Sequence, residues 1–330
     1  MGGGTKGGTS MRISKWLTAF AVLAGMATAA APGAAQEWPT KPVRVIVNYP
    51  AGGSMDAITR PFADALSRRL GQPFVVENRA GASGAVGTEA AVRATPDGYT
   101  ILASPNAPLV LLPALRRMPY APTDLTPVGP MGEFVYGIAV LPKTGFKTLA
   151  DLVAYAKANP GKLSYSSPGS GSATHLRGEA FKLLAGIDLL HVPYRTGAEA
   201  LIDFLGGTVD IIIDNVMFPH VRAGQATLLA VTSDRRFPMF ADTPTIMQAG
   251  YDVGLPTFAA IFVPKATPAA IQDKLTRAIA EANADPAVQQ RVLQIGFFPM
   301  TKTGPELAAE LGSQVAEYQD WVKRTGLKIE

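Results

Sequence analysis

Short runs of apolar and β-branched residues alternate along this chain with amphipathic segments of helical spacing. Residues 43–47 predict a buried strand, and residues 56–70 carry apolar side chains at helical intervals. A strand at 74–77, a short helix at 87–94 and a strand at 99–104 follow. This β-α-β-α-β order predicts a mostly parallel sheet with helices on both faces.

The alternation resumes in the middle of the chain and gives way to helices near its end. Further strands are predicted at residues 163–165, 189–192, 209–213 and 228–231, with one more near Phe297. Helices are predicted at residues 149–158, 173–184, 198–205, 268–284, 286–293 and 305–324. The pattern is that of an α/β protein with two sheets.

Two apolar segments flanked by Gly and Pro, residues 135–141 and 256–263, predict strands that cross between two lobes. We expect residues 36–134 and 264–330 to form lobe one. Residues 135–263, including the crossing strands, are expected to form lobe two. The predicted fold is therefore a two-lobed α/β fold whose mostly parallel sheets are flanked by helices and joined by two crossing strands.

Residues 1–35 read as a signal peptide with an N-terminal extension. Positive charges at residues 11–15 precede an apolar run at 16–31, and small residues at 33–35 offer a cleavage site before Gln36. A membrane anchor is the alternative, but the run is shorter than the roughly 20 residues that a span needs. We expect a periplasmic protein with no membrane insertion after cleavage, and the role of residues 1–10 stays open.

Charge and cysteine content exclude several function classes. The chain has 30 basic and 26 acidic residues, but Lys6, Arg12 and Lys15 lie in the leader, which leaves 27 against 26. Without a clustered basic face, nucleic-acid binding is not expected. The chain has no cysteine, which excludes thiol catalysis, disulfides and cysteine-ligated metals.

Two glycine-rich loops lie between a predicted strand and a predicted helix. Such loops present backbone N–H groups and the positive end of the helix dipole to an anion. The first supplies the candidate ligand-binding residues Ala51, Gly52, Gly53, Ser54 and Asp56. The second supplies Ser166, Ser167, Gly169, Ser170, Gly171, Ser172 and Thr174. A capped tight turn is the alternative for the first loop, and a flexible linker for the second.

Other candidate ligand-binding residues follow further strands. Tyr194, Arg195, Gly197 and Ala198 repeat the arrangement in the second lobe, Asp214 ends a β-branched strand, and Ser104 and Asn106 end the strand at 99–104. Arg195 can neutralise a carboxylate or be a solvated loop charge. Asn215 is expected to be a pocket wall or a helix cap.

An enzyme needs a base, a nucleophile or a metal in a recognisable arrangement. The histidines are His175, His191 and His220, without metal-ligand spacing, and no Gly-x-Ser-x-Gly motif is present. Ser172 and His175 can meet on one helical turn, but nothing supplies an oriented acid. We therefore expect no catalysis, no metal and no cofactor.

The chain resembles the extracytoplasmic receptors of tripartite tricarboxylate transporters, often called Bug-type receptors. The matching stretches cover essentially everything after Gln36, and they are residues 38–43, 49–56, 77–84, 96–99, 166–175, 205–210 and 264–268. The resemblance implies a periplasmic-binding-protein (Venus flytrap) fold that captures an organic acid or an amino-acid-like carboxylate. It implies that the two glycine loops hold the carboxylate, partly through ordered water.

The resemblance also implies partners, and it has two departures. The implied partners are the small carboxylate ligand and the membrane permease subunits of the transporter. We expect the mature protein to be a monomer. A ligand-sensing module that feeds a signalling partner is the alternative. The family usually has Gly-Gly-x-Pro where this chain has Thr-Gly-Ala-Glu at residues 196–199. The family often has an aromatic residue, typically Trp, in the second crossing strand, where this chain has Thr257-Phe258. Both departures bear on ligand identity.

Overall fold

The computed structural model describes residues 1–5, 37–254 and 256–325. The chain divides into two units, Met1–Thr40 and Lys41–Glu330, and every helix and strand among the described residues lies in the second. The predicted signal peptide with its N-terminal extension covers residues 1–35, and residues 6–35 of it lie outside the described residues. No helix within the described ranges is long and apolar enough to cross a membrane.

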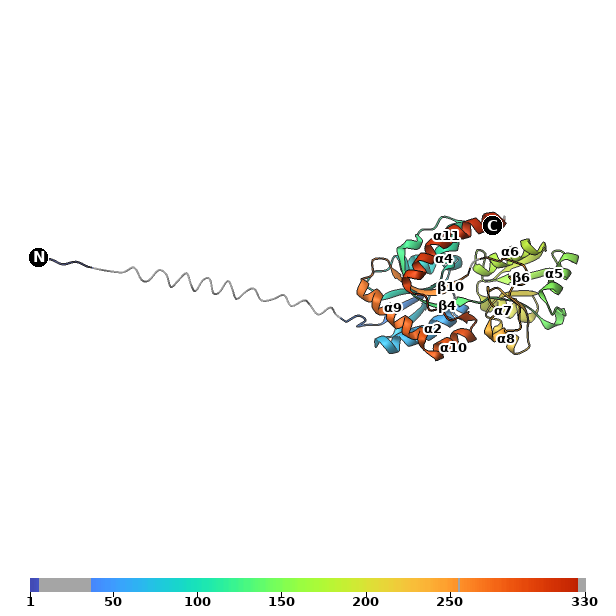
Figure 1. Ribbon diagram of the computed structural model, residues 1–330, viewed down its shortest axis with the longest axis horizontal. Coiled ribbons are helices and arrows are strands. Elements are labelled where there is room, and N and C mark those ends of the chain that lie inside the picture. Colours follow the sequence, from blue (N-terminus) through green and yellow to red (C-terminus); the bar gives the residue numbers. More distant parts are fainter. Residues whose placement is uncertain (6–36, 255, 326–330) are drawn as a thin grey trace. The chain divides into compact units, whose positions relative to one another are not determined.

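The first lobe of Lys41–Glu330 is built on a six-stranded sheet with the order β11-β4-β10-β3-β1-β2. Figure 1 labels two of these strands, β4 and β10. Its strands are β1 (Val43–Val47), β2 (Phe74–Asn78), β3 (Thr100–Pro105), β4 (Leu125–Phe134), β10 (Phe258–Pro264) and β11 (Phe297–Phe298). Its helices are α2 (Ser54–Leu70), α3 (Ala85–Val92), α4 (Ala107–Leu115), α9 (Ala269–Ala284), α10 (Pro286–Gln294) and α11 (Gly304–Thr325).

The second lobe is built on a five-stranded sheet with the order β7-β6-β8-β5-β9. Its strands are β5 (Gly137–Val140), β6 (Leu163–Ser167), β7 (Leu189–Pro193), β8 (Ile211–Asp214) and β9 (Thr227–Val231). Its helices are α5 (Leu149–Ala158), α6 (Ala173–Ala185), α7 (Gly197–Gly206) and α8 (Phe218–Arg222).

Both sheets are mixed, so the expectation of mostly parallel sheets is wrong in this detail. The strands joined by helices do pair in parallel, β1 with β2 and β3, and β6 with β7 and β8. However, β10 is antiparallel to β3 and β4, and β5 is antiparallel to β8 and β9. These antiparallel strands lie next to the crossings between lobes, where no helical crossover brings the chain back to the same end of the sheet.

The strand pairing places the lobe boundaries differently from the prediction. The first crossing is short: β4 ends in the first sheet at Phe134 and β5 begins in the second at Gly137. At the return, residues 258–263 were assigned to lobe two as part of a crossing strand, but β10 pairs along its length with β4 of the first sheet. Every residue of β10 is buried, so it is a core strand of lobe one, and the return crossing precedes Phe258.

Helix α2 shows how local sequence positions the first glycine loop. Asp56 lies in its first turn and Arg68 and Arg69 in its last, as the helix dipole favours. Gly71 ends the helix in the left-handed conformation at φ 73°, where a side chain would be strained. Ile58, Phe62 and other apolar residues at helical spacing are buried against the sheet, which fixes the helix start at the sheet edge.

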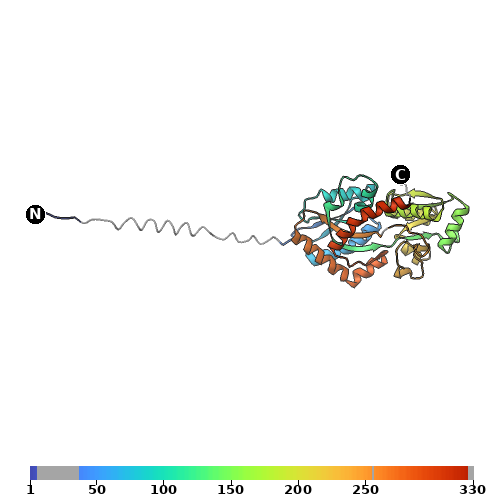
Figure 2. The same ribbon diagram turned by 45° about the horizontal axis from the view of Figure 1, so that its top comes forward.

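The C-terminal helix α11 joins the two lobes. It packs along α4 and β4 of the first lobe and contacts α6 of the second. In the turned view of Figure 2 this helix, in red, runs towards the second lobe. Trp321 near its end is 2% exposed and lies close to Gly254, within the segment that returns to the first lobe. The apolar cluster that contains Trp321 also holds Phe181 of α6 and Phe262 of β10. Core packing therefore continues from one lobe to the other.

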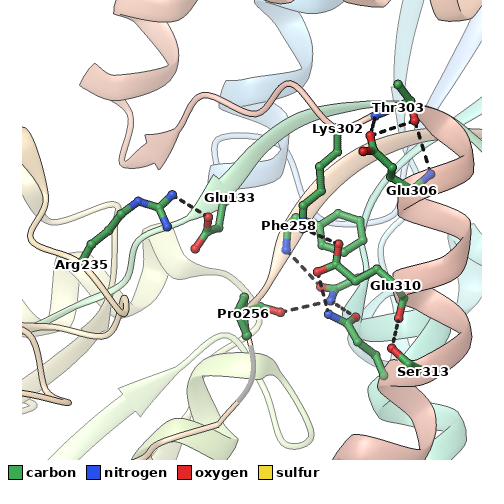
Figure 3. Close-up of polar contacts among 11 residues, drawn as sticks. Glu133, Arg235, Pro256, Phe258, Lys302, Thr303, Glu306, Glu310 and Ser313 are labelled. Atoms are coloured by element: carbon green, nitrogen blue, oxygen red, sulfur yellow. Dashed lines mark hydrogen bonds and ion pairs between the residues drawn. The ribbon is translucent and has the colours of Figure 1, made fainter.

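A hydrogen-bonded network holds the return crossing to the first lobe (Figure 3). The side chain of Asn106 donates to the carbonyl of Pro256 over 3.3 Å and to Gln314 Oε1 over 2.7 Å, and it accepts from the N–H of Phe258 over 3.2 Å. A polar contact also holds the first crossing: Arg235 of the second lobe donates from its guanidinium to Glu133 Oε2 of β4 over 2.8 Å. Side-chain hydrogen bonds therefore hold both crossings in place.

Candidate functional site

Four helices begin at one pocket between the lobes. Its lining includes Ser54, Ala107, Ala173 and Gly197, which are the first residues of α2, α4, α6 and α7. Two of these helices belong to each lobe. A helix start carries unpaired N–H groups and roughly half a positive charge, so the convergence favours a bound anion. The empty space of the pocket, with the open solvent at its mouth included, is about 600 Å³.

The start of α2 has no side-chain cap. Gly53 occupies the N-cap position, where it offers no capping oxygen, and both Gly53 and Ser54 line the pocket. Ala51 and Gly52 of the predicted set do not line it. Because no side chain occupies this helix start, its N–H groups are available to a ligand carboxylate.

Asp56 does not line the pocket, and its side chain stabilises the first glycine loop instead. Its Oδ2 accepts from the N–H of Gly52 over 3.1 Å and from Arg60 over 2.9 Å, and Asn78 donates to Oδ1 over 3.1 Å. Burial opposes the charged form, but hydrogen bonds from Arg60, Gly52 and Asn78 lower the pKa of this carboxyl on balance. Asp56 therefore holds the glycine loop in shape as a carboxylate.

The second glycine loop reaches the pocket through its last residues. Pro168, Ser172, Ala173 and Thr174 line it. Ser172 is the N-cap of α6, since its Oγ accepts from the N–H of His175 over 3.2 Å. Ser166, Ser167, Gly169, Ser170 and Gly171 of the predicted set do not line the pocket. They shape the loop instead: Ser166 donates to the carbonyl of Ile211, and Ser167 bonds to His191.

The third loop contributes Thr196 and Gly197 at the start of α7. Thr196 caps that helix by accepting from the N–H of Glu199 over 2.9 Å. The other predicted residues of this loop, Tyr194, Arg195 and Ala198, do not line the pocket. Tyr194 donates to Asp203 and Arg195 is exposed, so the solvated alternative for Arg195 describes this structure.

Asp214 brings a carboxylate into the pocket from the end of β8. It is 6% exposed, and burial raises the pKa of this carboxyl. Its Oδ1 accepts from the backbone N–H groups of Asn215 and Val216, at 2.7 and 3.2 Å, and from Ser54 Oγ at 3.3 Å. Ser54 also bonds to the side chain of Asn215. The first helix start and Asp214 are therefore direct neighbours across the lobes.

Ser104 and Asn106 serve the first lobe behind the pocket. Ser104 accepts from Asn48 over 2.7 Å, and Asn106 makes the crossing network described above. Neither lines the pocket, although their neighbours Pro105 and Ala107 do. The strand end that was predicted therefore reaches the pocket through these neighbours, and not through Ser104 and Asn106 themselves.

The sequence analysis named no ligand-binding residue in the remaining wall of the pocket, although it noted Thr257 as a departure that bears on ligand identity. Tyr49, Pro50, Met55, Phe134, Tyr136 and Thr257 all line it. Phe134 and Tyr136 stack with ring centroids 5.2 Å apart at an interplanar angle of 15°. Burial raises the pKa of both Tyr49 and Tyr136, so their hydroxyls stay protonated. Tyr49, Pro50 and Met55 flank the first glycine loop. Their position beside the loop could have identified them as lining residues from the sequence.

A buried arginine lies behind this wall. Arg177 of α6 is 6% exposed, and its guanidinium lies 5.0 Å from the centre of the Tyr136 ring. It donates to Thr257 Oγ1 over 3.2 Å and to the carbonyl of Ala173 over 3.1 Å. Arg177 therefore contacts three lining residues without lining the pocket itself, and it links α6 of the second lobe to the return crossing.

Comparison with known proteins agrees with this geometry. The family model described as the tripartite tricarboxylate transporter family receptor matches residues 58–327. BugT of Bordetella pertussis is 34% identical over 328 residues, which cover 97% of this chain and 100% of BugT. A UPF0065 protein of Bordetella bronchiseptica is 35% identical over 298 residues, covering 89% of this chain and 88% of that protein.

Solved structures show the same fold. The periplasmic binding protein BugD superposes with a TM-score of 0.83 at 32% identity, covering 89% of this chain and 100% of BugD. An R. palustris protein with adipate gives a TM-score of 0.81 at 30% identity, with 88% and 98% covered. MatC from Rhodopseudomonas palustris with bound malate gives 0.80 at 25% identity, with 86% and 100% covered.

These matches confirm the two-lobed α/β fold and the resemblance on which the sequence analysis drew. The matched family and its structural neighbours are extracytoplasmic solute-binding receptors and not enzymes. The family model matches most of the chain, and the alignment with BugT covers that relative along its whole length. This chain therefore belongs to the tripartite tricarboxylate transporter receptor family.

Proposed function

We propose that this protein captures a small carboxylate between its lobes and delivers it to the membrane permease subunits of a tripartite tricarboxylate-type transporter. The observation that carries the proposal is the convergence of four helix starts, two from each lobe, on one pocket. Related receptors determined with adipate and with malate support a carboxylate ligand.

The ligand contacts follow from the geometry. The carboxylate accepts hydrogen bonds from the start of α2 at Gly53 and Ser54 and from the start of α6 at Ser172 and Thr174. Each hydrogen bond from a neutral donor to a charged acceptor contributes about 1.5–3 kcal/mol. Three or four of them, less the costs of association, reach the roughly −8 kcal/mol of micromolar binding.

The proposal includes export to the periplasm with cleavage before Gln36 and a monomeric mature protein. Mass spectrometry of the exported protein should find an N-terminus near Gln36. Recovery of residues 11–35 on exported soluble protein would contradict cleavage.

A thermal-shift screen tests carboxylate capture. The protein is refolded from denaturant to remove retained ligand and is then mixed with mono-, di- and tricarboxylates. A ligand at 100 times its Kd stabilises the native state by about 2.7 kcal/mol, a clear rise in melting temperature. If no carboxylate in the panel raises the melting temperature, the proposed function is wrong.

A further inference from the structure

The pocket contains a carboxyl group, that of Asp214, of which the protein uses only one oxygen as a hydrogen-bond acceptor. Asp214 is 6% exposed, and the hydrogen bonds it accepts from Asn215, Val216 and Ser54 all go to Oδ1. No donor in the described part of the chain bonds to Oδ2. Oδ2 is not a fully buried atom, so it is accessible from the pocket, where a donor from a ligand can bond to it.

The surroundings of Oδ2 keep it open to a ligand. Gly197, which also lines the pocket, lies beside it: a Cβ added at Gly197 would come 3.1 Å from Oδ2. The absence of a side chain at this position therefore leaves room next to the carboxylate. Any larger residue would contact the oxygen and narrow the pocket.

The described lining offers no cationic side chain to balance a second anionic group. Among the described residues that line the pocket, none is Lys, Arg or His, and Asp214 is the acid. Arg177 lies behind Tyr136 and Thr257, where it contacts lining residues from outside the cavity.

The distance between the two polar ends limits the ligand further. Ser54 is the first residue of α2 and bonds to Asp214 over 3.3 Å, so the anion-binding helix start and the acceptor are adjacent. A ligand that meets both has its donor within a few bonds of its carboxylate. The remaining wall, with Met55, Phe134 and Tyr136, is apolar or aromatic and suits an apolar body.

We infer that the ligand is a monocarboxylate with an apolar body that carries an ammonium or hydroxyl donor next to its carboxylate, held by Asp214 Oδ2. This inference rests on the proposed function and narrows its ligand class. It separates this protein from the relatives determined with adipate and malate, whose ligands carry two carboxylates. Apolar α-amino acids and α-hydroxy acids share the required chemistry.

Isothermal titration of the refolded protein with matched probes tests the inference. The leucine and phenylalanine series each provide the amino acid, its 2-hydroxy analogue and the acid without either donor. Malate, adipate and citrate represent ligands with more than one carboxylate. One donor-bearing monocarboxylate should bind roughly ten- to a hundred-fold more tightly than its donor-free analogue. The amino and hydroxy arms identify the donor.

Asp214→Asn supplies the second arm of the test. The asparagine keeps an oxygen for the N–H groups of Asn215 and Val216 but replaces Oδ2 with an amide donor. We expect the preference for the donor-bearing probe to collapse and binding of the dicarboxylates to improve. Asp242→Asn, at an exposed position that does not line the pocket, removes the same charge and should leave the preference intact. Melting temperatures of both variants establish that they are folded.

The outcomes separate the two proposals. Three results would overturn the ligand class while leaving carboxylate capture in place. They are tightest binding of a di- or tricarboxylate, equal affinity for the donor-free analogue, and an unchanged preference in Asp214→Asn. Absence of binding by every carboxylate would instead overturn the proposed function.

Discussion

Ser83 of the first lobe donates a 2.8 Å hydrogen bond to the carbonyl oxygen of Ser170 in the second lobe. Ser83 has φ 55°, a left-handed conformation that is unfavourable for a residue with a Cβ. Neither residue lines the pocket. The contact therefore stabilises the arrangement in which the lobes meet, from outside the ligand site.

Removing this contact should weaken ligand affinity without altering the pocket. We expect Ser83→Ala to lose about 1 kcal/mol from the closed state, which is roughly a fivefold increase in Kd. Ser83→Gly loses the same bond but relieves the left-handed strain, so it should unfold at a higher temperature than Ser83→Ala. Small-angle scattering should show that the wild-type protein becomes more compact on binding. Wild-type affinity in both variants would exclude a closing role for the contact.

A side chain at Gly197 should obstruct the ligand site. The added Cβ of Gly197→Ala would lie 3.1 Å from Asp214 Oδ2, so we expect at least a tenfold loss of affinity with little loss of stability. Gly206→Ala is the matched control in the same helix, because its added Cβ would meet no atom closer than 4.0 Å. Titration calorimetry of both variants makes the comparison. Equal affinities would mean that the ligand does not approach Gly197.

The crossing network around Asn106 should matter for both stability and binding. Asn106→Ala removes three side-chain hydrogen bonds at a fully buried site, so we expect a loss of about 2–3 kcal/mol in the free energy of unfolding. Affinity should fall as well, because Ala107 and Thr257 line the pocket beside this network. Urea unfolding measures the first effect and calorimetry the second.

Asn159→Ala is the control for that experiment. Asn159 makes a single side-chain hydrogen bond, to the carbonyl of Tyr155 at the end of α5. Its loss should cost well under 1 kcal/mol. Comparable destabilisation by the two substitutions would show that the Asn106 network adds nothing to the crossing.

Acid should destabilise the second lobe through His191. Burial and the neighbouring His175, whose ring stacks 4.1 Å away, lower the pKa of His191 to about 4 from 6.5. Between these values the unfolded chain binds more protons than the folded one, so this contribution is complete above pH 6.5 and is lost as the pH falls towards 4. With partial exposure taken into account, the effect should be about 1–2 kcal/mol.

Urea unfolding of His191→Gln at several pH values checks this. The glutamine keeps a polar partner for Ser167, which bonds to the His191 ring over 2.7 Å, but cannot titrate. The unfolding free energy of the variant should therefore depend less on pH between 6.5 and 4. His220→Gln is the matched substitution outside the cluster. If His191→Gln and the wild type lose stability in parallel, the burial of His191 does not contribute to acid sensitivity.

Elements with strong local signals were predictable from the chain alone. Helix α5 has the predicted bounds, because helical spacing is reinforced by the capping pair of Thr148 and Asp151. The glycine loops were recognisable in the same way, and the structure places Gly53, Ser54, Ser172, Thr174, Gly197 and Asp214 of the predicted set around one pocket. Each of these features depends on residues close together in sequence.

Strand β4 and helix α4 were not predicted, since their local signals conflict with their structure. Helix α4 contains Pro108 and Pro113, and β4 contains Pro127 and Pro130. Proline disfavours the interior of helices and central strands. In the structure, register shifts in the β4–β10 pairing accompany these prolines, and the strand gains its stability from burial between β10 and β11.

The sequence by itself determined the alternation of strands and helices, the glycine loops at helix starts and the chemistry of an anion site. Only the tertiary structure decided which loop residues face the pocket, that Phe134, Tyr136 and Thr257 complete its wall, and that Ser54 meets Asp214 across the lobes. The physical reason is separation along the chain. Ser54 and Asp214 lie 160 residues apart, and their contact follows from packing two sheets through two crossings, which no local pattern encodes.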